Sequence, residues 1–274
     1  MNKKSSLLYR IAAVPHVVWS VMFIIAPLIF VAYYAFTDAD GSFTLDNIFA
    51  LSEHTETFFL SIAFSLIATV ICLLIGYPLA YALTKMKPRN QKILIMLLML
   101  PMWMNLLIRT YSMMAILDDG GFLNSLLSMM GLNEIHVIGT SGAVIFGMVY
   151  NFLPYMVLPI HSIMSKLDKR CIEAAADLGC NPFQTITEVI IPLTVPGIIS
   201  GITMVFVPSI STFYISQKLG GGTFDLIGDT IERQFMNPST YNIGAAISLV
   251  MMILILISVG IMNKFSDGEG GVMP

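Results

Sequence analysis

Six long apolar stretches divide the 274-residue chain. A helix needs about 20 apolar residues to cross a hydrocarbon core about 30 Å thick, and each stretch is that long. The expected spans are residues 17–36, 58–84, 93–116, 140–164, 190–215 and 242–262. Because 56% of the residues are hydrophobic and only 11% are charged, a soluble domain of this size is excluded. The sequence predicts an all-α integral membrane protein in which residues 1–274 form a single transmembrane domain with six transmembrane helices.

Basic residues gather on one side of these spans. They precede the first span, join the second to the third and the fourth to the fifth, and follow the sixth: Lys3, Lys4, Arg10, Lys85, Lys87, Arg89, Lys92, Lys166, Lys169, Arg170 and Lys264. The opposite loops carry only Lys218 and Arg233. Because Lys and Arg are retained on the cytoplasmic side of a membrane, we expect both the N and C termini to be cytoplasmic.

The opposite, outer loops are acidic. They contain Asp38, Asp40, Asp46, Glu53, Glu56, Asp118, Asp119, Glu134, Asp225, Asp229 and Glu232. A field of that sign attracts a cationic solute or a basic partner surface. The alternative is that acidic outer loops are simply what remains when Lys and Arg are kept inside.

The longest polar segment between two spans is the stretch from Lys166 to Pro192, which we call the elbow. Asp168 is placed to cap a helix, and Gly179 sits where a residue with positive φ would end it. Asn181 and Gln184 have the spacing of a second cap. The sequence therefore predicts a short helix, a glycine bend and a second helix that leads into the fifth span.

The elbow also carries a recognisable spacing: Glu-Ala-Ala at 173–175, three residues, Gly179, nine residues, and Val-Ile-Ile-Pro at 189–192. This resembles the EAA loop of ABC importer permeases, whereas Glu-Ala-Ala alone occurs in ordinary amphipathic loops. The resemblance implies the type I ABC importer permease (MetI-like) fold in a bacterial plasma (inner) membrane. It also implies that a cytoplasmic ABC ATPase dimer contacts this elbow. The implied ATPase-coupling residues are Glu173, Ala174, Ala175, Asp177 and Gly179.

The third span is interrupted at Pro101, where we expect the helix to break, and continues as MWMNLLIRTYSM. This stretch resembles the corresponding segment of permeases that import polyamines. Arg109 lies inside the span, where an ionisable residue is costly and calls for a partner. Asp118 and Asp119 are the candidates. We expect an ion pair that shapes a gate; direct contact with the solute is the alternative.

Aromatic residues in the fourth span, Tyr150, Phe152 and Tyr155, can present ring faces to an ammonium group. Packing or an interfacial belt is the alternative, because aromatic residues commonly serve those purposes in membrane helices. The candidates for the substrate pathway or gate are Trp103, Asn105, Arg109, Tyr150, Tyr155 and Tyr214.

A glycine-rich turn at 220–222 follows the fifth span, and helical spacing of apolar residues continues to Phe235. The spacing predicts an outer amphipathic helix with Asp225, Asp229 and Glu232 on its polar face. The run resembles the outer loop of polyamine permeases. These three acids are candidates for docking a solute-binding protein, with a helix lying on the bilayer as the alternative.

The resemblance implies a permease that translocates spermidine or putrescine and is not an enzyme. We expect no cofactor or metal on this chain, because it has no P-loop, so that ATP and Mg would be used by the partner ATPase. The other implied partners are a second permease subunit, most simply a paralogue, an extracytoplasmic solute-binding protein and membrane lipid, with no nucleic acid. Permeases for ferric ion, thiamine or an anion remain alternatives. So does a secondary transporter, although the spans lack the paired broken helices and midplane acids expected of one.

Overall fold

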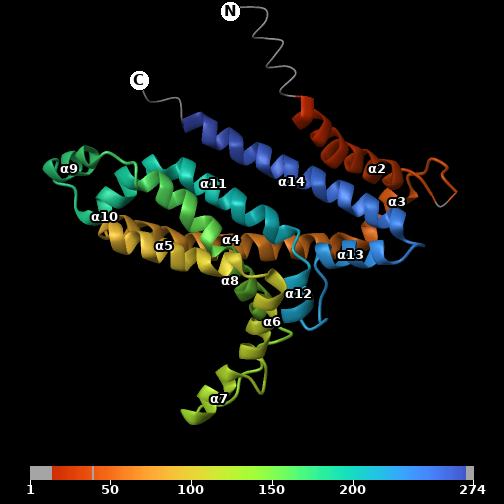
Figure 1. Ribbon diagram of the computed structural model, residues 1–274, viewed down its shortest axis with the longest axis horizontal. Helices are drawn as coiled ribbons and strands as arrows, with labels where there is room; N and C mark the ends of the chain where they lie inside the picture. Colours follow the sequence, from red (N-terminus) through yellow and green to blue (C-terminus); the bar gives the residue numbers. More distant parts are fainter. Residues whose placement is uncertain (1–13, 39, 270–274) are drawn as a thin grey trace, which may run out of the picture. The chain divides into compact units, whose positions relative to one another are not determined.

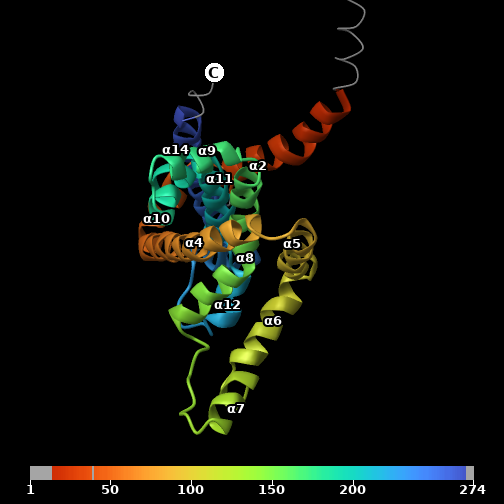
Figure 2. The same cartoon turned by 90° about the vertical axis from the view of Figure 1, so that its left-hand side faces the viewer.

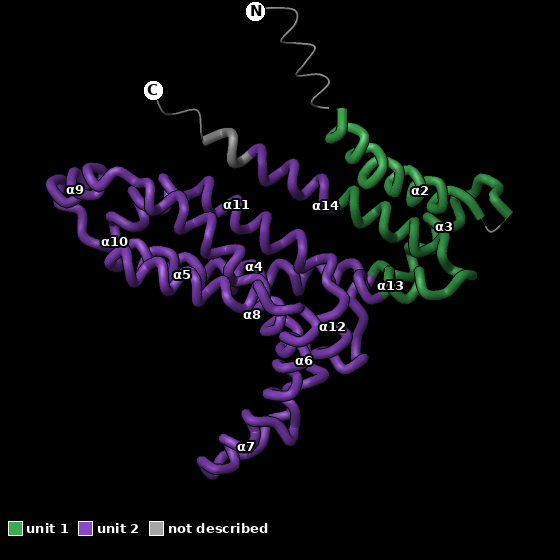
Figure 3. Tube along the Cα trace, in the orientation of Figure 1, with its two compact units in different colours: residues 1–55, 230–254 green, residues 56–229, 255–274 purple. Residues whose placement is uncertain are grey.

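The computed structural model describes residues 14–38 and 40–269. The predicted N-terminal basic residues Lys3, Lys4 and Arg10 lie outside the described residues. Contacts divide the chain into two units, shown in different colours in Figure 3. Unit 1 comprises residues 1–55 and 230–254, and unit 2 comprises residues 56–229 and 255–274. Apart from one antiparallel bridge between Thr37 and Phe43, the regular structure of the described residues is helical.

Unit 1 contains one long N-terminal helix, two short helices and parts of the last two helices. Its elements are a helix over Val14–Ala35 that includes η1 (Val21–Ile25) and α2 (Ala26–Ala35), then α3 (Asp46–Phe49) and η2 (Ala50–His54), together with parts of α13 (Ile227–Met236) and α14 (Tyr241–Glu269).

Close packing of small residues and two side-chain hydrogen bonds to one carbonyl oxygen hold unit 1 together. Ala35, Ala245 and Ala246 are fully buried against one another, so α2 and α14 approach closely, as small residues permit in membrane helices. The carbonyl oxygen of Thr37 accepts hydrogen bonds from the side-chain amides of Asn47, at 2.8 Å, and Asn242, at 2.5 Å. The two bonds provide donors for a carbonyl group just beyond the C-terminal end of α2, where the helix itself offers none.

Unit 2 holds the remaining helices (Figure 1). They are α4 (Thr55–Thr84), α5 (Pro88–Trp103), α6 (Leu106–Leu117), α7 (Phe122–Met129), α8 (Ser141–Met164), α9 (Lys169–Asp177), α10 (Pro182–Gln184), η3 (Thr185–Ile190), α11 (Ile191–Ile210) and α12 (Tyr214–Leu219). Helices α9 and α10 lie at one end of this unit, far from α6 and α7 in both views (Figures 1 and 2).

Helices α8 and α11 form the main packing contact of unit 2. A Cβ atom added at Gly201 of α11 would lie 2.7 Å from the Met156 sulfur and 3.1 Å from the Met156 carbonyl oxygen. Glycine is therefore needed at this position to let the two backbones approach. Met156, Val157 and Ile160 of α8 are fully buried in the resulting core.

Five helices are long and apolar enough to cross a membrane: Val14–Ala35, Asp46–Thr84, Ser141–Met164, Pro182–Ile210 and Tyr241–Lys264. They overlap five of the expected spans.

The remaining expected span, residues 93–116, is not one straight helix. Pro88–Trp103 and Leu106–Met129 meet at an angle of 96°. The break was expected at Pro101, but Pro101 lies inside α5. The chain turns instead at Met104 and Asn105, which have extended ψ angles of 147° and 133°. The Asn105 side chain accepts a hydrogen bond from the Leu107 amide at 2.7 Å and so starts a new helix.

Candidate functional site

The two short helices of the elbow begin and end as the sequence predicted. The Asp168 side chain caps α9 by accepting a hydrogen bond from the Arg170 amide at 3.0 Å. Gly179 has a φ of +86° directly after this helix. Asn181 and Gln184 then form a reciprocal capping box at the start of α10, with both hydrogen bonds at 2.9 Å. Because all these bonds are local, the bend keeps its shape without support from a partner.

Most of the predicted ATPase-coupling residues face outward. Glu173, Ala174, Asp177 and Gly179 are exposed. Ala175 is only 4% exposed, so it belongs to the inner face of α9, which packs against η3. Its small side chain allows the two parts of the elbow to lie close together, and its role in coupling remains a prediction.

Two large apolar side chains that the sequence reasoning missed project from the elbow. Leu178 is 85% exposed and Phe183 is 74% exposed, and they lie on either side of the Gly179 bend. The sequence signal was available, since each is an apolar residue beside a helix terminus in an otherwise polar segment. A neighbouring pair of exposed apolar side chains is suited to insertion into a partner's apolar pocket.

The second half of the elbow continues directly into the fifth span. Residues Pro182–Ile210 form one helical run, in which η3 is a π-helical segment. Near the start of α11, the Thr194 hydroxyl lies 3.1 Å from the Tyr77 hydroxyl of α4. Helix α10 is therefore continuous with α11, which contacts α4 through this pair of hydroxyl groups.

At the other end of unit 2, the bend in the third span separates two of the predicted pathway residues. Trp103 ends α5 and is 70% exposed, whereas Asn105 is used to cap α6. Asn105 therefore has a structural role at the bend, and Trp103 presents a large ring at the surface of the unit.

Arg109 lies on the inner side of α6, with 8% of its surface exposed. Its Nε and Nη1 atoms have no hydrogen-bond partner among residues 14–38 and 40–269. Arg109 lines a cavity of about 560 Å³ together with Met113, Phe146 and Tyr150. A buried guanidinium without a counter-ion is costly, so Arg109 is an unusual residue for the lining of this otherwise apolar cavity.

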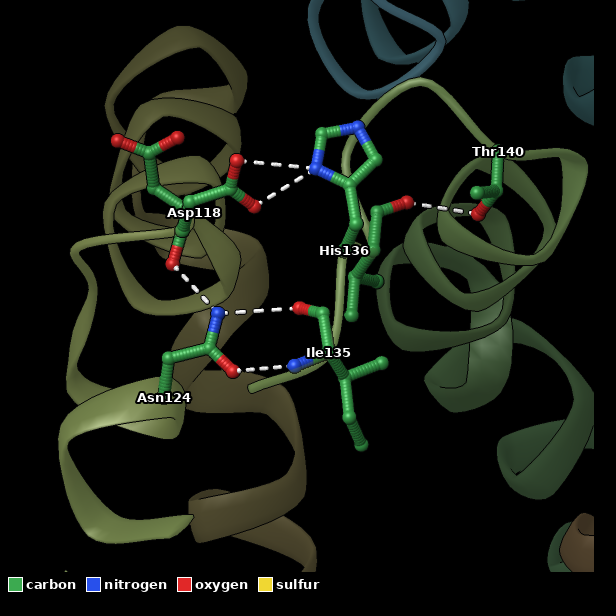
Figure 4. A network of polar contacts seen from close by, with 7 residues as sticks. Asp118, Asn124, Ile135, His136 and Thr140 are labelled. Atoms are coloured by element: carbon green, nitrogen blue, oxygen red, sulfur yellow. Dashed lines mark hydrogen bonds and ion pairs between the residues drawn. The ribbon is translucent and has the colours of Figure 1, made fainter. Parts of the chain in front are cut away.

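The expected ion pair of Arg109 with Asp118 or Asp119 is wrong. Asp119 instead contacts His136, with oxygen to Nδ1 distances of 2.8 and 2.9 Å (Figure 4). The Asn124 side chain donates to the carbonyl oxygens of Asp118 and Ile135, and it accepts from the Ile135 amide at 2.9 Å. Residues 118–124 thus fasten the loop after α7. Arg109 and Asp118 lie at the two ends of the same α6 helix, where nine residues separate them by about 13 Å and place them on opposite faces.

The predicted aromatic residues of the fourth span do not form one cage. Tyr150 and Tyr155 are 39% and 37% exposed, but they line different cavities. Tyr150 belongs to the Arg109 cavity, whereas Tyr155 lines a separate cavity of about 460 Å³ with Gly197 and Met204. A separation of five residues places two side chains on different helix faces, which explains the result.

Tyr214, by contrast, joins a cluster with a cation. Its ring packs edge to face against that of Tyr111, with centroids 6.1 Å apart. The Lys218 ammonium lies 5.3 Å from the Tyr111 centroid and 5.8 Å from the Tyr214 centroid. The sequence reasoning found Tyr214 but missed Tyr111 and Lys218, because α6 and α12 come together only in the folded unit. We call these three residues the aromatic clamp.

The glycine-rich turn at 220–222 is attached to the loop before α8. The Thr223 hydroxyl donates to the Gly139 carbonyl oxygen at 2.9 Å, and the Gly139 amide donates to the Leu219 carbonyl oxygen at 2.8 Å. At Gly221 φ is +58°, and a Cβ there would lie 3.2 Å from the Gly139 Cα. Glycine is required for both reasons, and the turn is a fixed joint in this structure.

One predicted docking residue is wrong in its placement. Asp229 was expected on the polar face of the outer helix, but only 5% of it is exposed. Its carboxylate accepts a hydrogen bond from the Leu226 amide at 2.8 Å, because the first turn of α13 has amide groups that need an acceptor. Asp225 and Glu232 are half-buried, and their docking role remains a prediction.

The described residues thus form a helical membrane protein with several apolar spans, one of them bent, and an exposed elbow. The model of the family described as "Binding-protein-dependent transport system inner membrane component" matches residues 5–268. The chain belongs to this family and is a multi-pass protein of the bacterial inner membrane.

Several relatives of known function are similar over most of their length. The chain is 39% identical over 246 residues to the spermidine/putrescine transport system permease protein PotB of Haemophilus influenzae, with 86% of each chain covered. It is 39% identical over 246 residues to the PotB protein of Escherichia coli K12, covering 86% of this chain and 90% of that one.

Solved structures share the fold. A bacterial ABC transporter involved in the import of the acidic polysaccharide alginate has a chain that matches with a TM-score of 0.77 and 21% identity, covering 97% of this chain and 96% of that chain. The inward-facing MetNI methionine ABC transporter matches with a TM-score of 0.54 and 17% identity, covering 80% of this chain and 95% of that chain. The expected type I ABC importer permease fold is confirmed.

Proposed function

We propose that this chain is the permease subunit of an ATP-driven importer that carries polyamines, spermidine or putrescine, into the cytoplasm. The observation that carries the proposal is the 39% identity to PotB permeases over 86% of the chain. The acidic outer loops agree with a cationic solute, since they raise its local concentration.

The elbow is the proposed site for the ATPase. Its exposed face combines Glu173 and Asp177 with the apolar side chains of Leu178 and Phe183. The sequence has no P-loop, so ATP and Mg would be bound by a cytoplasmic ATPase dimer, and this chain would bind no cofactor of its own. Closure of that dimer would push α10, and the continuous helix to Ile210 would pass the movement to the spans as a nearly rigid body.

The remaining partners are proposed from the family. A solute-binding protein would deliver the polyamine at the outer side, where Asp225 and Glu232 lie near α13. A second permease subunit, most simply a paralogue, would complete the pathway. In this arrangement the elbow and both termini are cytoplasmic, as the distribution of Lys and Arg favours.

Uptake by the complete complex tests the proposal. The permease pair, the ATPase and the binding protein are reconstituted in vesicles, and ATP-dependent uptake of radiolabelled spermidine and putrescine is measured. Omission of the ATPase should abolish uptake. Uptake of ferric ion, thiamine or an anion in place of both polyamines would refute the substrate and retain the permease.

A further inference from the structure

The aromatic clamp holds a primary ammonium between two tyrosine rings. Tyr111 comes from α6 and Tyr214 from α12, and the Lys218 ammonium lies within 6 Å of both ring centroids, at 5.3 and 5.8 Å. Distances in this range define a cation–π contact. The rings are tilted by 78° to one another, so the ammonium meets two ring systems at once.

The chemistry of this site matches the end of a linear polyamine. Lys218 is a four-carbon chain that ends in a primary ammonium, and a polyamine also consists of short alkyl chains that end in primary ammonium groups. A site that accepts one therefore accepts the other, because the ring faces recognise the charge and the adjoining methylene groups.

The resident cation is carried on a flexible side chain near the end of a short helix. Lys218 lies in the last turn of α12, which has six residues, and its side chain is flexible and strongly hydrated. Tyr111 is 47% exposed, so a solute can reach its ring. The other nearby cation, Arg109, is buried and lies two residues before Tyr111, on a different face of α6. The cation that contacts the clamp rings is Lys218.

We propose that the aromatic clamp receives the terminal ammonium of an entering polyamine, and that Lys218 is a tethered competitor that occupies the clamp when no polyamine is present. This inference rests on the proposed function and names a site for its substrate. Each binding event displaces the Lys218 ammonium, which weakens the apparent affinity of the clamp. A weaker clamp releases its solute more readily, as a transport pathway requires.

The direction of change in KM tests this role. Vesicles with the complete complex take up spermidine, and wild type is compared with Lys218→Met. Loss of the competitor should lower KM by about three- to tenfold, since one cation–π contact is no longer displaced. Tyr111→Leu and Tyr214→Leu should raise KM, and Tyr111→Phe, which keeps the ring face, should raise it less than Tyr111→Leu. Lys218→Arg keeps the cation and is the matched control.

The same assays separate this role from a purely structural one. If Lys218 only fastens α12 to α6, Lys218→Met lowers the amount of assembled complex or the maximal rate, and KM stays unchanged or rises. That result overturns the inference. Lys218→Gln provides a second variant if Lys218→Met does not assemble. Failure of the wild-type complex to take up either polyamine refutes the proposed function itself, whereas wild-type uptake with an unchanged KM in both lysine variants refutes only the clamp.

Discussion

The side-chain amide of Gln91 lies 2.6 Å from Nε2 of His161 and forms a hydrogen bond that joins α5 to α8. An amide nitrogen can only donate, so the histidine nitrogen is the acceptor and its proton is on Nδ1. Both side chains are half-buried. The bond ties the first half of the bent span to the helix that leads into the elbow.

Breaking this bond on one side should destabilise the protein more than removing both partners. Gln91→Leu or His161→Phe leaves a half-buried polar group unpaired, which costs about 1–2 kcal/mol. The double variant should lose less than the sum of the two. The thermal midpoints of the four detergent-solubilised proteins form a double-mutant cycle, and strictly additive losses would show that the two residues do not interact.

Gly179→Ala should impair coupling more than its strain alone explains. Gly179 has a φ of +86°, and a Cβ atom added there would meet no atom within 4 Å. The alanine methyl group would therefore destabilise the fold only through the unfavourable backbone conformation, by about 1–2 kcal/mol. Gly131 is the matched control, since its φ is +72° and it too has open space. Polyamine-stimulated ATP hydrolysis by the complete complex should fall several-fold in Gly179→Ala and stay near wild type in Gly131→Ala. Equal losses would argue against the elbow as the coupling element.

Leu178→Asp and Phe183→Asp should each weaken binding of the ATPase to the elbow. A charge placed in an apolar pocket is strongly disfavoured, so the yield of ATPase that co-purifies with the permease should drop at least tenfold. Met129→Asp is the control, because Met129 is 86% exposed, close to the 85% of Leu178, but lies on α7. Retention of the ATPase by both elbow variants would remove these two side chains from the interface.

Gly201→Ala should loosen the packing of α8 on α11. The new methyl group would lie 3.1 Å from the Met156 carbonyl oxygen, and backbone cannot yield as a flexible side chain does. We expect a loss of about 1–3 kcal/mol, measured as a lower thermal midpoint. Gly260→Ala in α14 meets nothing within 4 Å and should be neutral or stabilising. An unchanged thermal midpoint in Gly201→Ala would mean that α8 and α11 leave room for a methyl group at this position.

Asp229→Ala should reduce stability without a change in the affinity of the solute-binding protein. The carboxylate is buried and bonded to the Leu226 amide, and the loss of such a bond at a helix start costs about 1 kcal/mol. Glu232→Ala, on the same helix, tests whether Glu232 contributes to the affinity of the solute-binding protein. A large fall in binding-protein affinity with an unchanged thermal midpoint in Asp229→Ala would return Asp229 to the docking surface.

The sequence could predict what is decided locally. The caps at Asp168 and Asn181 and the bend at Gly179 depend on residues within a few positions of one another, and all three have the predicted form. Hydrophobic length likewise located five continuous spans.

Contacts between distant segments could not be predicted in this way. Tyr111 and Lys218 meet only because α12 packs on α6, and no spacing along the chain shows that. Arg109 was assigned a partner nine residues further along the same helix, but nine residues span about 13 Å and put two side chains on opposite faces. Asp229 was placed outside because polar residues usually are, whereas the unpaired amides of α13 held it inside.

The π-helical segment Thr185–Ile190 gives the run from Pro182 to Ile210 an odd geometry. A π turn accommodates one residue more than an α turn. Deletion of a single residue within 185–190 would let the run relax to a regular α-helix with little rotation of α10 about the axis of α11, whereas the same deletion within the regular part of α11 would turn α10 by about 100° relative to the rest of that helix. The π-helical segment therefore gives the run one residue of tolerance: a deletion there should keep the direction in which the elbow points, and a deletion in regular α11 should change it although every side chain on the elbow is unchanged.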